Sequence, residues 1–367
     1  MTAKGFAPGP PVRFESADTF TRYIHRRAAK EQRILFAARL QLYQSAQWWS
    51  KLALFFHMKS SRSYELIGAA FGLGSDNRGT MGAPAAYRRA GVLERLQRLG
   101  FSVAAGSDIG LPTGFPLDGP GADPRLRNLA GMEEFARLMI PALRAIYSRG
   151  ATPVVLGGDH ALSMVTISVA AEVLKERHGP DAELGVLWVD AHGDVNTAQT
   201  TPSGNLHGMP GAVLLGHGEP SLVNLCGFAP KVKPRNHVLM GVRDLDGGEK
   251  DFIRAHGLSA FTMKDIDLWG IGEIARRAFA QVTRHTQGFV VSFDVDVCDP
   301  NLAPAVGTPV RGGFTFREAH LVMELAAEYE SLLSVEVVEF NPEFDDRSLT
   351  CELAISLLES ALGKSIL

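Results

Sequence analysis

Four apolar segments of this chain end in acidic or histidine residues, and this pattern constrains the fold more than any other feature. The segments cover residues 152–160, 184–192, 288–296 and 332–342, and two further apolar runs cover residues 64–74 and 237–244. Runs of Val, Leu and Ile that alternate with helical stretches are typical of a parallel sheet buried on both faces. Open sheets of this kind bind ligands at the carboxyl ends of their strands. We therefore expect one α/β domain over residues 61–367, with its charged residues gathered at one edge.

The intervening segments have the apolar spacing of helices. The spacing predicts helices near residues 82–100, 130–148, 161–177, 269–285, 315–330 and 350–363. Residues 107–125 are rich in Gly and Pro, which predicts a long surface loop there.

The composition excludes several classes of function. A net charge of −3 gives no global reason to expect a nucleic acid or an anionic membrane as partner. No run of about eighteen apolar residues indicates a transmembrane helix. The cysteines Cys226, Cys298 and Cys351 are few and lack the CxxC spacing of a thiolate zinc site. They favour a reducing, cytoplasmic compartment.

Residues 1–60 differ from the rest of the chain in charge. They hold ten Lys or Arg against three Asp or Glu, a balance of +7, whereas the remaining residues balance at −10. This basic extension could be a helical appendage, a mitochondrial-type targeting segment, or sequence upstream of a start at Met58. Its segment "QWWSKLALFF" also fits a membrane-surface or partner-binding arm.

The residues that follow the apolar segments have the chemistry of metal ligands. A single Asp or His after a buried strand is more often a helix cap or a loop residue than a ligand. Here that ordinary explanation would have to hold separately at four strand ends. It also does not explain why two acids, Asp294 and Asp296, lie close together in an apolar run. Unpaired carboxylates so close would repel one another, and a divalent cation removes the conflict. Oxygen donors with some imidazole suit Mn²⁺, with Co²⁺, Fe²⁺ or Ni²⁺ as substitutes, and two such ions can activate a water for hydrolysis. The residues at the four segment ends are Asp159, His160, Asp190, His192, Asp194, Asp294, Asp296 and Glu339. Six of them, four Asp and two His, are the candidate ligands: His160, Asp190, His192, Asp194, Asp294 and Asp296.

The blocks "GGDHALS", "DAHGDVN", "SGNLHG", "SFDVDVCDP" and "EFNP" resemble the signature blocks of the ureohydrolases, the arginase and agmatinase group. The resemblance runs from about Tyr64 to the C-terminus. It implies a three-layer α/β/α sandwich with a mainly parallel sheet, two Mn²⁺ ions per subunit, and a homo-oligomer that is a trimer or a hexamer. The first ion would be bound by His160, Asp190, Asp194 and Asp294, and the second by His192, Asp190, Asp294 and Asp296.

The resemblance also implies a mechanism, in which a metal-bridging hydroxide attacks the guanidinium carbon and urea is released. Asp194 would handle the proton of the leaving amine, and His207 would exchange protons with solvent. Glu339 would pair with the substrate guanidinium, which stays cationic and needs an anion. Arg243, Asp244 and Thr308 would support these residues, although each has an ordinary structural interpretation as well.

The substrate expected from the resemblance is L-arginine, which differs from agmatine by its α-carboxylate. Asn196, Thr201 and Ser203 match positions that bind this carboxylate directly or through water. Asp246, with Glu249 near it, matches the acid that faces the α-ammonium group, and Thr308 completes the substrate contacts. Agmatine or another guanidino compound is the alternative substrate, and a non-catalytic binding protein is a further alternative. Gly193 departs from the pattern, because many relatives carry Thr there.

Overall fold

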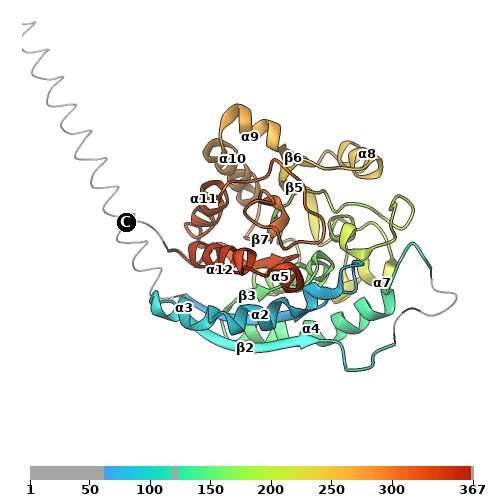
Figure 1. The fold of residues 1–367 in the computed structure, drawn as a ribbon. Coiled ribbons are helices and arrows are strands. Elements are labelled where there is room, and N and C mark those ends of the chain that lie inside the picture. The colour runs from blue at the N-terminus through green and yellow to red at the C-terminus, as the bar shows by residue number, and fades with distance from the viewer. Residues whose placement is uncertain (1–61, 117, 119–122, 365–367) are drawn as a thin grey trace, which may run out of the picture. The chain divides into compact units, whose positions relative to one another are not determined.

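Eight parallel strands form one sheet, in the order β2-β1-β3-β8-β7-β4-β5-β6 (Figure 1). The structure is a computed structural model that describes residues 62–116, 118 and 123–364. The expectations for residues 1–60 therefore lie outside the described residues. The strands are β1 (Ser63–Ala70), β2 (Ser102–Gly110), β3 (Thr152–Leu156), β4 (Leu184–Val189), β5 (Val232–Val242), β6 (Ser259–Thr262), β7 (Gly288–Asp294) and β8 (Leu332–Val338).

Helices pack on both faces of the sheet, as expected for a three-layer α/β/α sandwich. One apolar cluster joins the sheet to α2 (Ala83–Arg89), α3 (Val92–Arg98), α9 (Met263–Trp269), α10 (Ile271–Arg284), α11 (Phe316–Ala326) and α12 (Leu349–Ala361). A second cluster joins the opposite face to α4 (Leu129–Ser148), α5 (Ser163–His178), α6 (Pro210–Leu214) and α7 (Pro220–Val223).

Strand β4 shows why the apolar runs are continuous. Leu187 and Val189 belong to the first cluster, whereas Val186 and Trp188 belong to the second. Because alternate side chains enter different cores, every position of the strand is buried.

The strands that carry the charged ends are neighbours in the sheet. β3, β8, β7 and β4 lie side by side in that order. Their carboxyl ends therefore meet at one edge, and the residues that follow them in the sequence converge there, as expected. The backbone segments that follow β1 and β3 approach each other closely at this edge, which explains why residue 158 is a glycine. A Cβ on Gly158, just after β3, would lie 1.8 Å from the carbonyl oxygen of Phe71.

Several elements differ from the sequence-based expectation. The edge strands β2 and β6 were not predicted, because one is largely exposed and rich in small residues and the other has only four residues. The predicted loop at 107–125 accordingly begins only after Gly110. The helix predicted at 82–100 is two helices, since Gly91 adopts a left-handed φ of 76° between them. Helix α8 (Gly247–His256) was also missed.

No helix among the described residues is long and apolar enough to cross a membrane.

Candidate metal and substrate site

The two aspartate motifs after β4 and β7 form the same type of turn. In each motif one oxygen of the first carboxylate accepts the backbone N–H two residues later: Asp190 Oδ1 from His192 at 2.7 Å, and Asp294 Oδ1 from Asp296 at 2.8 Å. The other oxygen, Oδ2, faces inward toward His160. These turns explain why the acids and histidine alternate along the sequence. The chain bends at residues 190–192, and Asp194 has a left-handed φ of 52°.

His160 lies at the centre of the first group of candidate ligands. Its Nδ1 atom is 3.1 Å from Asp190 Oδ2, 3.1 Å from Asp194 Oδ2 and 3.2 Å from Asp294 Oδ2. The ring is fully buried, and it stacks on Trp188 with the centroids 4.0 Å apart. The Nδ1 atom has no hydrogen-bond partner of good geometry among the described residues. An imidazole nitrogen that faces three carboxylate oxygens in this way is suited to share a cation with them.

The opposite nitrogen of His160 is held by a buried chain of hydrogen bonds. Nε2 lies 2.8 Å from Ser292 Oγ, and Ser292 donates its hydroxyl proton to Glu336 Oε1 at 2.6 Å. Glu336 also accepts hydroxyl groups from Ser163 and Thr166, both at 2.5 Å. Since the Ser292 proton goes to Glu336, the serine oxygen accepts from Nε2–H of His160. This fixes the tautomer in which Nδ1 carries the free lone pair, the form required of a metal ligand.

The second group of candidate ligands shares Asp190 with the first. His192 Nδ1 lies 3.3 Å from Asp190 Oδ1 and 3.2 Å from Asp296 Oδ2. Ligand atoms from Asp190, His192 and Asp296 all lie within 4.8 Å of one another, as do those from His160, Asp190 and Asp194. These two groups, together with Asp294, are called the carboxylate cluster below. It consists of His160, Asp190, His192, Asp194, Asp294 and Asp296.

Residues around the cluster support the second group of candidate ligands. Thr308 Oγ1 donates to Asp296 Oδ2 at 2.9 Å. Arg243 donates to backbone carbonyls, including those of Asp296 at 2.6 Å and Val310 at 2.7 Å, and so joins the turn after β7 to the segment that carries Thr308. Asp244 takes part through its backbone N–H, which donates to the carbonyl of Ala191 at 3.0 Å.

The charges of the cluster call for a cation. Burial, and next the neighbouring charges of Asp296 and Asp190, raise the pKa of Asp294 well above its usual range. Burial disfavours a charge on His160, but the surrounding carboxylates outweigh it and raise the pKa of that ring well above its ordinary value. Among the ion pairs of the described residues, none joins a Lys or Arg to a cluster carboxylate. The donor set of four carboxylates and two imidazoles therefore fits divalent metal ions.

Glu339 and His207 form a buried pair beside the cluster. Glu339 Oε1 accepts from the backbone N–H of His160 at 2.8 Å, and it lies 3.0 Å from His207 Nδ1. Burial works against a charge on His207, but the Glu339 carboxylate raises its pKa to about 9. His207 in turn lowers the pKa of Glu339 against the effect of burial.

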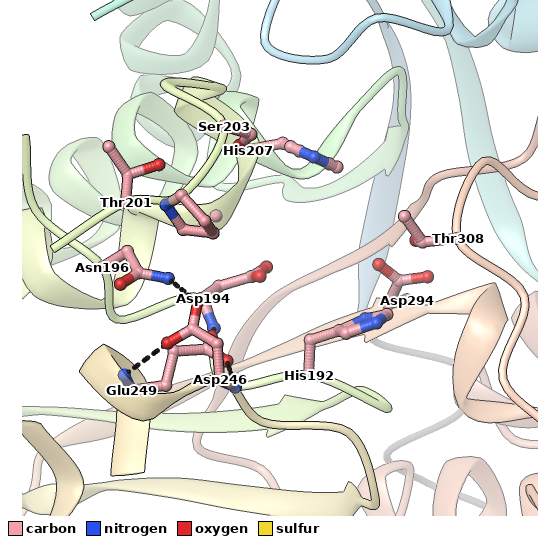
Figure 2. A pocket seen from close by; sticks show the side chains of 12 residues that line it. His192, Asp194, Asn196, Thr201, Ser203, His207, Asp246, Glu249, Asp294 and Thr308 are labelled. Atoms are coloured by element: carbon pink, nitrogen blue, oxygen red, sulfur yellow. Dashed lines mark hydrogen bonds between the residues drawn. The ribbon is translucent and has the colours of Figure 1, made fainter. Parts of the chain in front are cut away.

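A cavity of about 230 Å³ opens above the cluster (Figure 2). Ten of its twelve lining residues were predicted as site residues, so these ten lie together around one cavity. They are His192, Asp194, Asn196, Thr201, Ser203, His207, Asp246, Glu249, Asp294 and Thr308. The other four, His160, Asp190, Asp296 and Glu339, are at most 2% exposed and are not among its lining residues.

The polar residues on the cavity side away from the cluster, called the rim below, are Asn196, Thr201, Ser203 and Asp246. Asn196 Nδ2 donates to Asp246 Oδ2 at 2.7 Å (Figure 2), while Asn196 Oδ1 accepts from Thr200 Oγ1 at 2.8 Å. The Asn196 amide is thus oriented by two partners, and one N–H remains to donate.

The rim hydroxyl oxygens accept backbone N–H groups. Thr201 Oγ1 accepts from Gly204 at 2.9 Å, and Ser203 Oγ accepts from Asn205 at 3.2 Å. Since each oxygen is used as an acceptor, each hydroxyl proton is available to a ligand. Donors from this side of the cavity suit an anionic group.

Two residues were missed. Asp159, which also follows a buried strand, accepts the backbone N–H groups of Gly74 and Ala161 and belongs to neither group of candidate ligands. Ser292 and Glu336 were missed, because both lie inside strand runs that are otherwise apolar. A glutamate in a buried strand was the available signal, since such a carboxylate requires buried partners.

Comparisons with known proteins agree with this geometry. The Arginase family profile matches residues 62–363. The arginase of Bacillus caldovelox is 43% identical over 302 residues, which cover 82% of this chain and 98% of that protein. The arginase of Bacillus subtilis (strain 168) is 40% identical, with coverages of 83% and 99%. The native Bacillus caldovelox arginase structure has a TM-score of 0.78, covering 83% of this chain and all of that one. The Entamoeba histolytica arginase in complex with L-ornithine has a TM-score of 0.73 at 27% identity, with coverages of 83% and 99%.

Proposed function

The chain belongs to the arginase family of hydrolases, and on that premise we propose that it cleaves the guanidinium group of L-arginine to give L-ornithine and urea. The observation that carries the proposal is the carboxylate cluster beneath a cavity. Two groups of metal-competent side chains share Asp190, and the cavity above them is lined by polar residues on its other side.

We propose two Mn²⁺ ions as the cofactor. His160, Asp190, Asp194 and Asp294 would hold the first ion, and His192, Asp190, Asp294 and Asp296 the second. Their oxygen and imidazole donors suit Mn²⁺ better than a thiophilic metal. When bound, such an ion pair supplies the Lewis acidity that activates water for attack on a guanidinium carbon.

Glu339 and His207 have separate roles in the proposal. Glu339 supplies a buried anion for the guanidinium; its Oε1 is engaged by His160 and His207, which leaves Oε2 for the substrate. His207 lines the cavity and uses Nδ1 toward Glu339, which leaves Nε2 for proton exchange with solvent. Asp194 lines the cavity next to the cluster and would pass a proton to the departing amine.

The rim supports L-arginine over agmatine as the substrate. The remaining N–H of Asn196 and the hydroxyls of Thr201 and Ser203 can donate to an α-carboxylate, whereas agmatine has none. Asp246 Oδ2 accepts from Asn196, and its carboxylate provides the anionic partner for an α-ammonium group.

The test is a urea-release assay with manganese-loaded protein on L-arginine, agmatine and guanidinobutyrate side by side. Turnover of L-arginine well above the other two is the expected result. A preference for agmatine would overturn the substrate proposal but not the metal chemistry. Metal binding without turnover of any of the three would favour the alternative of a non-catalytic binding protein.

We propose further that the protein acts in the cytoplasm as a homo-oligomer, a trimer or a hexamer, and that residues 1–60 are an extension outside the catalytic domain. The three cysteines are free thiols in the described structure, which fits a reducing compartment. Deleting residues 1–57 and measuring activity and sedimentation tests this division. Unchanged activity is expected, and loss of activity with intact folding would contradict it.

A further inference from the structure

Glu249 is a buried acid whose oxygens are occupied by the protein backbone. It lies in the first turn of α8 and is 5% exposed. Its Oε1 accepts the N–H of Asp194 at 2.7 Å and that of Gly193 at 3.2 Å, and its Oε2 accepts the N–H of Asp246 at 3.1 Å. Three N–H donors compensate the burial of a carboxylate that pairs with no Lys or Arg among the described residues.

The first of these contacts fixes an unusual backbone conformation. Asp194 has a φ of 52°, in the left-handed region that side chains other than glycine rarely adopt. Its N–H is held by Glu249, and its carbonyl accepts from the N–H of Gly211 at 2.8 Å. With the backbone held on both sides, the Asp194 carboxylate is directed at His160 Nδ1, 3.1 Å away.

The third contact connects this turn to the rim. Asp246 is the N-cap of α8, and its Oδ1 accepts the N–H of Glu249 at 2.9 Å in a reciprocal capping box. The Oδ2 atom of the same side chain accepts from Asn196. The Glu249 carboxylate therefore joins the backbone of Asp194, a cluster residue, to the backbone of Asp246, a rim residue.

Gly193 has no side chain that could press on Glu249. A Cβ at Gly193 would lie 3.0 Å from Glu249 Oε1 and 2.9 Å from Leu245 Cδ2, both of which are the ends of flexible side chains. A small side chain here would therefore require only small shifts of these two neighbours.

We propose that Glu249 is a positioning residue, which holds Asp194 in its left-handed turn and so sets the first metal site from the rim side. This inference rests on the proposed function and deepens it. Glu249 then acts through Asp194, and direct contact with the substrate is not its main role.

The test measures Mn²⁺ binding by isothermal titration and by electron paramagnetic resonance, together with kcat and KM. Glu249→Ala is expected to weaken the first metal site by about 10-fold to 100-fold, the range for lost residues that orient metal ligands. The second site, which uses His192 and Asp296, is expected to change much less. Glu249→Gln keeps one acceptor for Asp194 and Gly193, so its loss should be intermediate.

Two further variants control the result. Glu318→Ala removes the equivalent capping-box bond of α11, in which the N–H of Thr315 donates to Glu318 Oε2, and should leave metal binding unchanged. Gly193→Ala changes the neighbouring residue but retains Glu249 and its three N–H donors, and should leave the first site close to that of the wild type.

Wild-type metal binding in Glu249→Ala with only a raised KM would overturn the proposal in favour of a direct substrate contact. Equal losses in Glu249→Gln and Glu249→Ala would also overturn it, because positioning requires an acceptor and not a charge. Circular dichroism verifies folding. Since metal binding is read without turnover, failure of the proposed L-arginine hydrolysis would be seen separately in the wild-type protein.

Discussion

The carboxylate cluster and the rim are both polar and both face the same cavity, yet they differ in how their polar groups are satisfied. In the cluster, Asp190, Asp194 and Asp294 all turn an oxygen toward one imidazole nitrogen, and no Lys or Arg of the described residues pairs with them. In the rim, Asn196 is hydrogen-bonded to both Asp246 and Thr200.

This difference separates two requirements of the site. The cluster is complete only when cations neutralise it, so its residues should control metal binding and the rate of the chemical step. The rim groups are already hydrogen-bonded within the protein and keep a few donors to spare, so these residues should control which substrate binds. The predictions below test this division, from the largest expected effect to the smallest.

Asp296→Ala should reduce kcat by about a thousand-fold or more, because a metal centre supplies several kcal/mol of charge stabilisation in the transition state. The variant should bind one Mn²⁺ per chain in place of two, measured by atomic absorption after dialysis. Near-normal turnover with one bound ion would contradict a two-metal mechanism here.

Ser292→Ala should weaken Mn²⁺ binding by about 10-fold to 100-fold, because His160 loses the partner that fixes its tautomer. Ser168 provides a matched control, since it is also buried but donates to the carbonyl of Met164 within α5. If Ser168→Ala and Ser292→Ala have equal effects on metal affinity, the Ser292–Glu336 chain has no special role.

Asn196→Ala should lower kcat/KM for L-arginine by about tenfold, the value of one hydrogen bond to a charged group. The value for agmatine should hardly change, and both Mn²⁺ ions should remain bound. Asn224→Ala, an exposed asparagine that donates to the carbonyl of Pro220, serves as the control. A comparable loss for both substrates would show that the rim does not determine selectivity.

Two buried histidines, His160 and His237, stack on the same indole ring and can be compared. Trp188 stacks on His160 and also on His237, with centroids 5.7 Å apart in the second pair. No carboxylate opposes the burial of His237, so burial, and then the charge of His160, lower its pKa to about 4. Charged neighbours therefore decide the direction of the shift, since both rings are buried.

This shift predicts a pH dependence of stability. Between about pH 4 and pH 6.5 the unfolded chain binds a proton at His237 that the folded chain does not, so stability falls as the pH falls through this window. The free energy of unfolding of the wild type should fall by about 2 kcal/mol more than that of His237→Phe between pH 7 and pH 5. Urea titrations of both proteins measure this, with the exposed His285→Phe as control. Parallel pH profiles for wild type and His237→Phe would contradict it.

Most of the cluster could be predicted from the sequence, because its residues follow buried strands at short, regular spacings. That spacing follows from a chemical rule, since Asp190 and Asp294 must each accept the N–H two residues later to form their turns. The left-handed turn at Asp194 could not be predicted in the same way. It depends on Glu249, which lies 55 positions further along the chain. Likewise, the edge strands β2 and β6 lack the continuous apolar run that made the central strands recognisable.

The most direct test of the central claim is a crystal structure of the manganese-loaded protein with anomalous diffraction data. Two anomalous peaks are predicted, one beside His160 and Asp194 and the other beside His192 and Asp296, with Asp190 and Asp294 in contact with both. A single peak in the cluster, or manganese bound only elsewhere on the chain, would contradict the account.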